Sequence, residues 1–349
     1  MTVAAPEQIA AFLADPANFL IGLDLGQGQF QFIRMPRQEV SDKAFLDTRA
    51  IGAQHKKTEL PGAAVLETLR GEMTKQPPLK ACYLFHTSFC CSTLIARCLD
   101  MPGINLSLKE PYALLGLSGF KRRSKNFDTR SDQWINWRDL TLRLLSRRFV
   151  AGERILLKPS NGANNILPEI LDYPGTDKVV LLYSSLDHFL VAAIGGGEAW
   201  FSYISAILKL FIRDFGDGVD LADPSELTAL HRAALAWALQ MKAFEAAAGS
   251  FPEKVTTLDC QRFLDDPADI LVRLNVFYDL GFDRKDLEAV ASGPVMTAHS
   301  KEPGKAHSPK DQVEETLKVI RENRKEFTEV AKWCRDLGLD YKGGLSNPL

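Results

Sequence analysis

The chain has 349 residues, of which 46% are hydrophobic and 25% charged, and its formal net charge is −2 at pH 7. This length allows one large α/β domain or two smaller ones, and the composition is that of a globular protein with a substantial core. The near-zero net charge excludes a global basic field for nucleic acid or an anionic membrane, so any anion must be bound by a local cluster.

The first 75 residues have the pattern of an N-terminal extension. A short helix is predicted over Pro6–Leu13. Residues 19–25 are mostly apolar, residues 29–34 alternate apolar and polar side chains, and a glycine-containing turn separates the two runs. This arrangement favours a β-hairpin. We therefore predict that residues 1–75 form an extension packed on a main domain of residues 76–349.

From residue 80 the chain alternates short apolar segments with helical ones. Each apolar segment is nearly continuous, as strands buried on both faces of a parallel sheet are. The alternation predicts an α/β fold with three layers, α/β/α, around a central, mostly parallel five-stranded sheet. The predicted strands are Cys82–His86, Ile104–Leu108, Ile155–Lys158, Val179–Tyr183 and Val255–Leu258. The predicted helices among them are Ser92–Leu99, Asp132–Arg148, Ile166–Leu171, Leu186–Ile194, Trp200–Asp214, Ser225–Ala248 and Pro267–Leu280.

The chain is predicted to close with one long helix. Ser308 is placed as its N-cap and Pro309 at its first helical position, where the missing N–H of proline costs nothing. Apolar side chains then recur at helical spacing to near Gly338.

Neither a basic leader with an apolar core nor an apolar run of about 18 residues is apparent in the sequence. We therefore expect a cytoplasmic protein with no membrane and no nucleic-acid partner. The six cysteines lack the C-x-x-C pairs and histidine spacing of zinc sites. Reduced thiols and no metal are expected, and the oligomeric state is left open.

One segment carries the main functional signal, because a predicted strand leads into a loop rich in hydroxyl groups that opens directly into a helix. The first N–H groups of a helix have no partner within the helix, and together with the positive helix end they bind phosphate or sulfate. Side-chain hydroxyls add further donors to such a loop. The predicted anion-binding residues are Thr87, Ser88, Phe89, Cys90, Cys91, Ser92 and Thr93.

This loop does not match the phosphate loop of nucleotide kinases, G-x-x-x-x-G-K-[ST]. Both glycines are absent, and Cys91 or Ser92 stands where the lysine belongs. An ordinary ATP or GTP hydrolase is therefore disfavoured.

The segment Cys91–Arg97 instead resembles the phosphosulfate-binding loop of bacterial sulfotransferases, S-G-[ST]-T-L-L-A-R. Downstream, residues 108–115 resemble the second-strand element of that family, in which an acidic residue and a proline follow the strand, here Glu110 and Pro111. The resemblance implies a P-loop-type sulfotransferase fold. It also implies transfer of a sulfonate group from 3′-phosphoadenosine 5′-phosphosulfate (PAPS) to a hydroxyl or amine of a small-molecule or glycan acceptor.

Three residues are candidates for the chemistry. The resemblance implies that Glu110 is the general base, although it could instead cap the following helix or pair with Lys109. His86, just before the loop, is the second candidate base, or a strand-end histidine that orients the turn. Lys158 ends a predicted strand with a cation facing the expected site, or is a lysine that extends to the surface. The parallel strands should bring these residues to one edge of the sheet, together with Ser184.

The sequence departs from the family where the 3′-phosphate of the donor is bound. Ser184 stands where the family has an arginine, and Ala192 where it has a serine. Loss of a bidentate guanidinium weakens phosphate recognition. Either another cation replaces it, from Arg97, Lys301 or Lys305, or the donor is a different one. The loop containing Lys301 and Lys305 resembles the family's flexible basic loop, which folds over the nucleotide, although an ordinary solvated loop is the alternative interpretation.

Two alternatives stay open. One is a P-loop kinase-like phosphotransferase, which the missing Gly-Lys pair disfavours. The other is a protein without catalytic activity that binds a nucleotide or a partner on the same fold, which the replaced arginine and serine favour.

Overall fold

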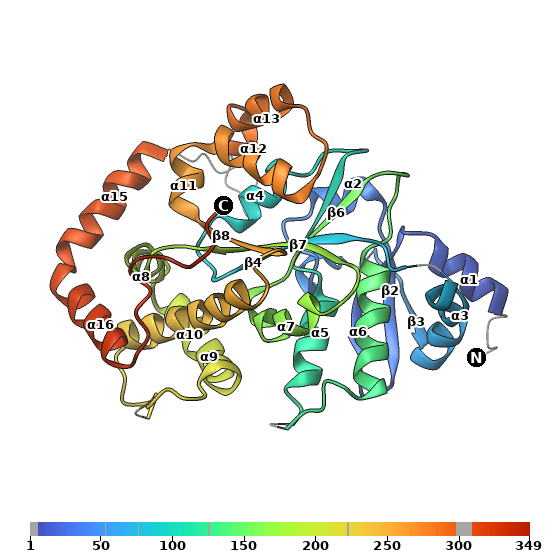
Figure 1. The fold of residues 1–349 in the computed structure, drawn as a ribbon, viewed down its shortest axis with the longest axis horizontal. Helices are drawn as coiled ribbons and strands as arrows, with labels where there is room; N and C mark the ends of the chain where they lie inside the picture. Colours follow the sequence, from blue (N-terminus) through green and yellow to red (C-terminus); the bar gives the residue numbers. More distant parts are fainter. Residues whose placement is uncertain (1–5, 53, 76, 125, 222, 298–308) are drawn as a thin grey trace. The chain divides into compact units, whose positions relative to one another are not determined.

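The computed structural model describes residues 6–52, 54–75, 77–124, 126–221, 223–297 and 309–349 (Figure 1). The chain divides into two compact units. The first contains Met1–Leu84, Ala96–Val179 and Asn275–Phe282, and the second contains Phe85–Ile95, Val180–Leu274 and Asp283–Leu349. All of residues 1–75 fall in the first unit, whereas their separation as an extension from a main domain stays a prediction.

A five-stranded sheet flanked by helices has the strand order β5-β6-β4-β7-β8 (Figure 1). Its β5–β6 and β6–β4 pairs are parallel. Because β4 and β5 are buried along their whole length, only apolar residues or paired polar groups can occupy them. The predicted α/β class and its five strands are confirmed. The strands are β4 (Ala81–His86), β5 (Asn105–Lys109), β6 (Arg154–Lys158), β7 (Thr176–Tyr183) and β8 (Val255–Asp259).

The helices of the described residues follow the predicted alternation, with several short additions. The first unit contains α1 (Pro6–Ala14), α2 (Arg37–Asp42), α3 (Gly62–Lys75), α5 (Tyr112–Lys121), α6 (Asp132–Leu145), α7 (Leu167–Leu171) and the 3₁₀ turns η1 (Thr48–Ala50) and η2 (Asn161–Ile166). The second contains α8 (Leu186–Gly195), α9 (Gly197–Phe215), α10 (Ala229–Ser250), α11 (Cys260–Asp265), α13 (Arg284–Ala291), α14 (Pro294–Thr297), α15 (Pro309–Glu322) and α16 (Arg324–Asp336). Residues of both units form α4 (Ser92–Cys98) and α12 (Pro267–Tyr278).

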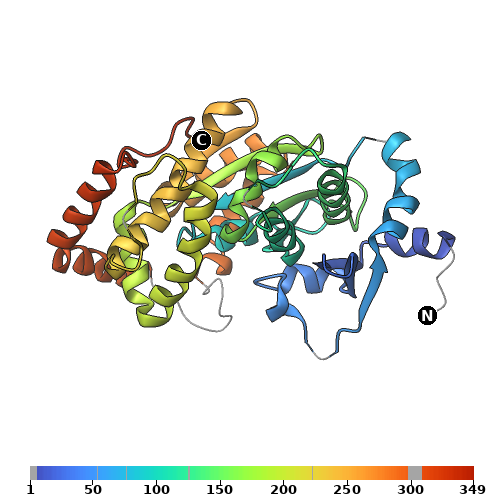
Figure 2. The same cartoon turned by 90° about the horizontal axis from the view of Figure 1, so that it is seen from below.

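The predicted N-terminal hairpin is confirmed and belongs to a three-stranded antiparallel sheet (Figure 2, blue). Strands β1 (Asn18–Asp24) and β2 (Gln29–Arg34) pair as expected, and β3 (Lys57–Pro61) adds to β2. The third strand was missed because none of its side chains is buried. Without a buried face it carries no hydrophobic alternation in the sequence.

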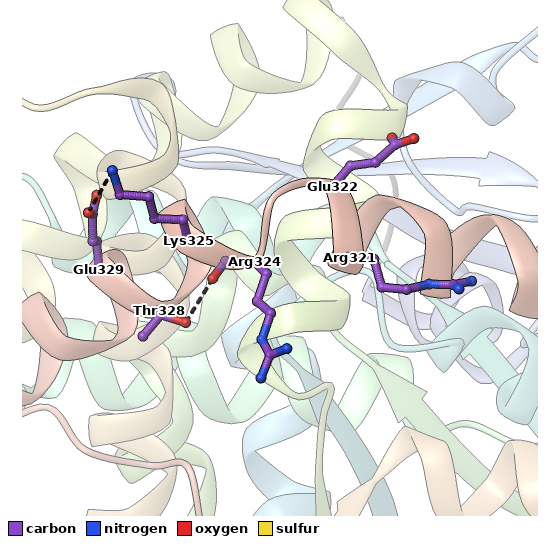
Figure 3. Close-up of a pocket in the computed structure, with 6 residues that line it drawn as sticks. All are labelled: Arg321, Glu322, Arg324, Lys325, Thr328 and Glu329. Atoms are coloured by element: carbon purple, nitrogen blue, oxygen red, sulfur yellow. Dashed lines mark hydrogen bonds and ion pairs between the residues drawn. The ribbon is translucent and has the colours of Figure 1, made fainter.

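The prediction of one closing helix was wrong, because the chain forms α15 and α16 with a break at Asn323. This residue leaves the helical region, with φ −108° and ψ 18°, and its side-chain amide donates to the carbonyl of Val319 at 2.9 Å. Asparagine side chains compete in this way with the helical backbone. The predicted N-cap Ser308 lies outside the described residues. Figure 3 shows a surface hollow lined by residues on both sides of the break, Arg321, Glu322, Arg324, Lys325, Thr328 and Glu329.

A buried ionic cluster joins α2 to β5 in the first unit. The Arg37 guanidinium donates to Glu153 Oε1 at 2.8 Å, to Asp100 Oδ1 at 3.0 Å and to the carbonyl of Asn105 at 3.0 Å. Lys109 Nζ lies 3.5 Å from Asp100 Oδ2. Both carboxylates are almost completely buried and share Arg37 as a partner, as buried charges must be paired.

Candidate functional site

Non-glycine residues with a strained, left-handed backbone are concentrated directly after two strands of the sheet. Among the described residues, six non-glycine residues have a left-handed φ, and two of them are an aspartate and an asparagine, which tolerate it well. The other four follow β4 or β5, and each such residue costs about 1–3 kcal/mol that the surrounding structure must offset. They are Ser88 (φ 76°), Phe89 (φ 51°), Cys91 (φ 51°) and Glu110 (φ 56°).

The loop after β4 is held by hydrogen bonds within the second unit. The Thr87 N–H donates to the carbonyl of Leu182 at 3.1 Å, and Gln240 Nε2 donates to the carbonyl of Thr87 at 3.2 Å. The Cys90 thiol is directed at the same Leu182 carbonyl, with 3.8 Å between sulfur and oxygen. Strand β7 and helix α10 thus fix the loop in its left-handed conformation.

His86 orients this turn. Its Nδ1 atom accepts the N–H of Ser88 at 3.1 Å. A neutral imidazole that accepts at Nδ1 carries its proton on Nε2, so neither nitrogen is then disposed to take up another proton. This geometry favours the interpretation of His86 as a strand-end residue that shapes the loop.

Three hydroxyl-bearing residues of the loop are buried, Thr87, Ser92 and Thr93, whereas Ser88 is half-buried. The Phe89 ring packs edge-on against Trp200 of α9, with 4.8 Å between ring centroids. The predicted loop residues therefore combine a fixed backbone with hydroxyl groups at the start of α4, while the aromatic contact ties the loop to its own unit.

Ser184 follows β7 and is fully buried. Its carbonyl accepts the indole N–H of Trp237 at 2.8 Å, whereas its hydroxyl has no hydrogen-bond partner among the described residues. A buried hydroxyl without a partner is costly, and a polar ligand would remove that cost.

In the first unit, Glu110 and Lys158 form a close ion pair. Lys158 Nζ donates to Glu110 Oε1 at 2.7 Å, and the Glu110 N–H donates to the Lys158 carbonyl at 2.7 Å. The lysine side chain is fully buried and the glutamate side chain is 15% exposed. Lys158 is therefore not a surface lysine, and the carboxylate of Glu110 is the group of this pair that faces solvent.

One of the other interpretations of Glu110 is not what the structure shows. Lys109 pairs with Asp100 instead, and burial lowers the pKa of the Lys109 ammonium. Glu110 is thus not the partner of its neighbour, whereas a capping role at the start of α5 stays an open interpretation.

Sequence reasoning missed Arg49, whose Nη2 lies 3.7 Å from Glu110 Oε2. It comes from η1, far from Glu110 in the sequence and without a recognisable motif. Asp47 caps η1 by accepting the Arg49 N–H at 2.8 Å. Nothing in this short segment distinguishes Arg49 from other loop arginines, so no sequence signal could have found the contact.

The remaining predicted residues, Lys301 and Lys305, lie outside the described residues. Within the described part of the chain, no group of three or more His, Cys, Asp or Glu side chains is arranged to bind a metal ion. The described helices include none that is both long and apolar enough to span a membrane.

The loop lies in the second unit, whereas Glu110, Lys158 and Arg49 lie in the first. Chemically, the loop offers hydroxyl groups and a fixed backbone to an anion. The Glu110 cluster offers a partly exposed carboxylate next to two cations. These are the functional groups that anion binding and general base catalysis require.

No family model and no curated protein match the chain. Solved structures with similarity include the sulfotransferase domain from the curacin biosynthetic pathway, 14% identical over 68% of this chain and 87% of that chain, with a TM-score of 0.40. The sulfotransferase domain from the Synechococcus PCC 7002 olefin synthase is 13% identical over 70% of this chain and 96% of that chain, with a TM-score of 0.33. The fold class follows from the strand order and pairing of the chain itself.

Proposed function

We propose that the chain is a sulfotransferase-like enzyme that transfers a sulfonate group from PAPS to a hydroxyl or amine of a small-molecule or glycan acceptor. The observation that carries this proposal is the concentration of strained, non-glycine backbone after β4 and β5. Such strain persists where a binding or catalytic site requires it. The same two positions carry the sequence resemblance to the phosphosulfate loop and to the second-strand element of sulfotransferases.

In this proposal the residues from Thr87 to Thr93 bind the phosphosulfate, and the buried hydroxyl of Ser184 contributes to donor binding. Glu110 accepts the proton of the acceptor as the acceptor oxygen or nitrogen attacks sulfur. The bond between sulfur and the phosphate oxygen breaks, and 3′-phosphoadenosine 5′-phosphate leaves. Lys158 keeps the Glu110 carboxylate oriented through its bond to Oε1. Sulfuryl transfer depends mostly on positioning and electrostatics, as phosphoryl transfer does.

The proposal also assigns a role to the basic segment that contains Lys301 and Lys305. Its resemblance to the flexible basic loop of sulfotransferases suggests that it closes over the bound nucleotide. The two ammonium groups would then supply the positive charge that Ser184, in the place of an arginine, does not.

The proposal is tested by nucleotide binding. Calorimetry and thermal shift with 3′-phosphoadenosine 5′-phosphate, ATP and AMP separate the candidate ligands, since a ligand that binds the native state raises the unfolding midpoint. The double variant Ser92→Ala/Thr93→Ala should bind the bisphosphate nucleotide at least about tenfold more weakly, because charge-assisted hydrogen bonds contribute about 1.5–3 kcal/mol each. Ser225→Ala/Thr328→Ala, which alters two exposed residues elsewhere, is the matched control.

Unchanged affinity in the loop variant, with the fold preserved, would contradict the assignment of the loop. Tighter binding of ATP than of the bisphosphate nucleotide would favour a phosphotransferase. Nucleotide binding without any turnover of PAPS would favour the non-catalytic alternative, which the presence of Ser184 in place of an arginine supports.

A further inference from the structure

Residues 43–50 form a strap beside the end of β5. The N–H of Leu46 donates to the carbonyl of Lys109 at 2.7 Å, and the carbonyl of Leu46 accepts the N–H of Tyr112 at 3.0 Å. One bond is made by the residue before Glu110, and the other by the residue two positions after it. The strap thus helps to fix the left-handed backbone of Glu110, which would otherwise relax.

Within the strap, Arg49 is itself held in one orientation. Its Nε donates to Asp47 Oδ1 at 3.0 Å and to Oδ2 at 2.8 Å, and its Nη2 also donates to Asp47 Oδ2. The guanidinium carbon lies 3.9 Å from the centroid of the Phe45 ring. A guanidinium that is hydrogen-bonded to a carboxylate and stacked on an aromatic ring is already immobilised. It therefore loses little further conformational freedom when it contacts a third group.

The orientation of Arg49 places a cation at each oxygen of Glu110. Lys158 Nζ is 2.7 Å from Oε1, and Arg49 Nη2 is 3.7 Å from Oε2. The exposed fraction of the side chains rises from 0% for Lys158 to 15% for Glu110 and 60% for Arg49. Arg49 is therefore the solvent-side neighbour of the carboxylate.

We propose that Arg49 is a positioning residue that holds the Glu110 carboxylate in the orientation needed to accept the acceptor proton. This inference rests on the proposed function, since it requires Glu110 to be the base. It assigns a catalytic purpose to the N-terminal strap, which the sequence resemblance does not cover.

The test compares variants in the release of 3′-phosphoadenosine 5′-phosphate from PAPS, with water and with a panel of alcohols and phenols as acceptors. Arg49→Ala should lower kcat about 10–100-fold, because a misplacement of about 1 Å costs about 10²-fold. The KM for PAPS should stay within about twofold, because the loop is unaltered. Arg49→Lys keeps a cation but loses the bidentate hydrogen bonds to Asp47. It should therefore recover part of the kcat that Arg49→Ala loses.

Arg34→Ala is the matched control, since it removes an exposed ion pair with Asp15 at 2.9 Å in the same N-terminal region. It should leave kcat and KM unchanged.

An unchanged kcat in Arg49→Ala would overturn the inference while leaving the proposed function intact. Equal losses in Arg49→Ala and Arg49→Lys, with a lower urea midpoint in both, would also overturn it by showing a structural role only. Wild-type protein that binds nucleotide without turnover would overturn the catalytic function and this inference together.

Discussion

Lys109 and Lys158 end neighbouring strands in register, and both are fully buried, yet their partners differ. Lys109 Nζ donates to the carbonyls of Ser41 at 2.9 Å and Ser107 at 3.3 Å. Lys158 Nζ instead donates to the carboxylate of Glu110, which is partly exposed. The first ammonium is anchored to main chain and lies 3.5 Å from the buried carboxylate of Asp100, whereas the second is bonded to a carboxylate that can meet a ligand. Burial of a lysine alone therefore does not distinguish a structural from a functional role, whereas its partner does.

The largest expected effect in this comparison comes from Glu110→Gln. Glutamine keeps the shape of the side chain but does not accept the proton, so turnover of PAPS with a verified acceptor should fall about 10²–10⁴-fold. Nucleotide affinity should not change, because the loop is unaltered. Asp100→Asn is the matched control at Lys109, and it should leave turnover near that of the wild type. Near-wild-type transfer by Glu110→Gln would exclude Glu110 as the base.

Replacement of each lysine by methionine should lower the free energy of unfolding, and the two losses can be compared. Lys158→Met leaves a largely buried carboxylate without its close partner, and removal of one member of a buried pair costs about 3–5 kcal/mol. Lys109→Met leaves Asp100 paired with Arg37 at 3.0 Å, but it removes the ion pair to Asp100 and hydrogen bonds from a charged donor worth about 1.5–3 kcal/mol each. Urea unfolding measures both free energies. A larger loss for Lys109→Met would show that the ionic cluster, and not the Glu110 pair, is the more tightly coupled of the two.

The sheet was predictable from the sequence because its strands are buried on both faces. Strand β4 is an apolar run for this reason, and the loop after it was recognised by its hydroxyl residues. The resemblance to sulfotransferases pointed to Glu110, which lies at a strand end. In each case the signal lies in a short continuous segment, where local pattern and tertiary environment agree.

What could not be predicted depends on contacts between distant segments. Arg49 reaches Glu110 because Leu46 bonds to the main chain beside it, and the segment around them contains no pattern that predicts this contact. Strand β3 carries no buried side chain, so its pairing with β2 leaves no pattern. The break at Asn323 depends on a side-chain bond that competes with an otherwise regular helical pattern.

The smallest expected effect concerns the thiol of Cys91, whose reaction rate compares the loop with the buried parts of the protein. Cys91 is half-buried, whereas the other five cysteines are buried. Burial raises the pKa of Cys82 and of Cys98 to about 12, and only the thiolate is a nucleophile. At pH 8, a disulfide reagent such as 5,5′-dithiobis(2-nitrobenzoate) should therefore react rapidly with Cys91 and slowly with the buried thiols.

If the loop binds the nucleotide, 3′-phosphoadenosine 5′-phosphate at ten times its Kd should slow the fast reaction about tenfold, because only the free protein reacts. Cys91→Ala should lose the fast phase, which identifies the thiol, and unfolding in guanidinium should expose the remaining five. AMP at the same concentration serves as the control ligand, since it lacks the 3′-phosphate. Equal rates with and without the bisphosphate nucleotide, under conditions where calorimetry shows it bound, would place the nucleotide away from this loop.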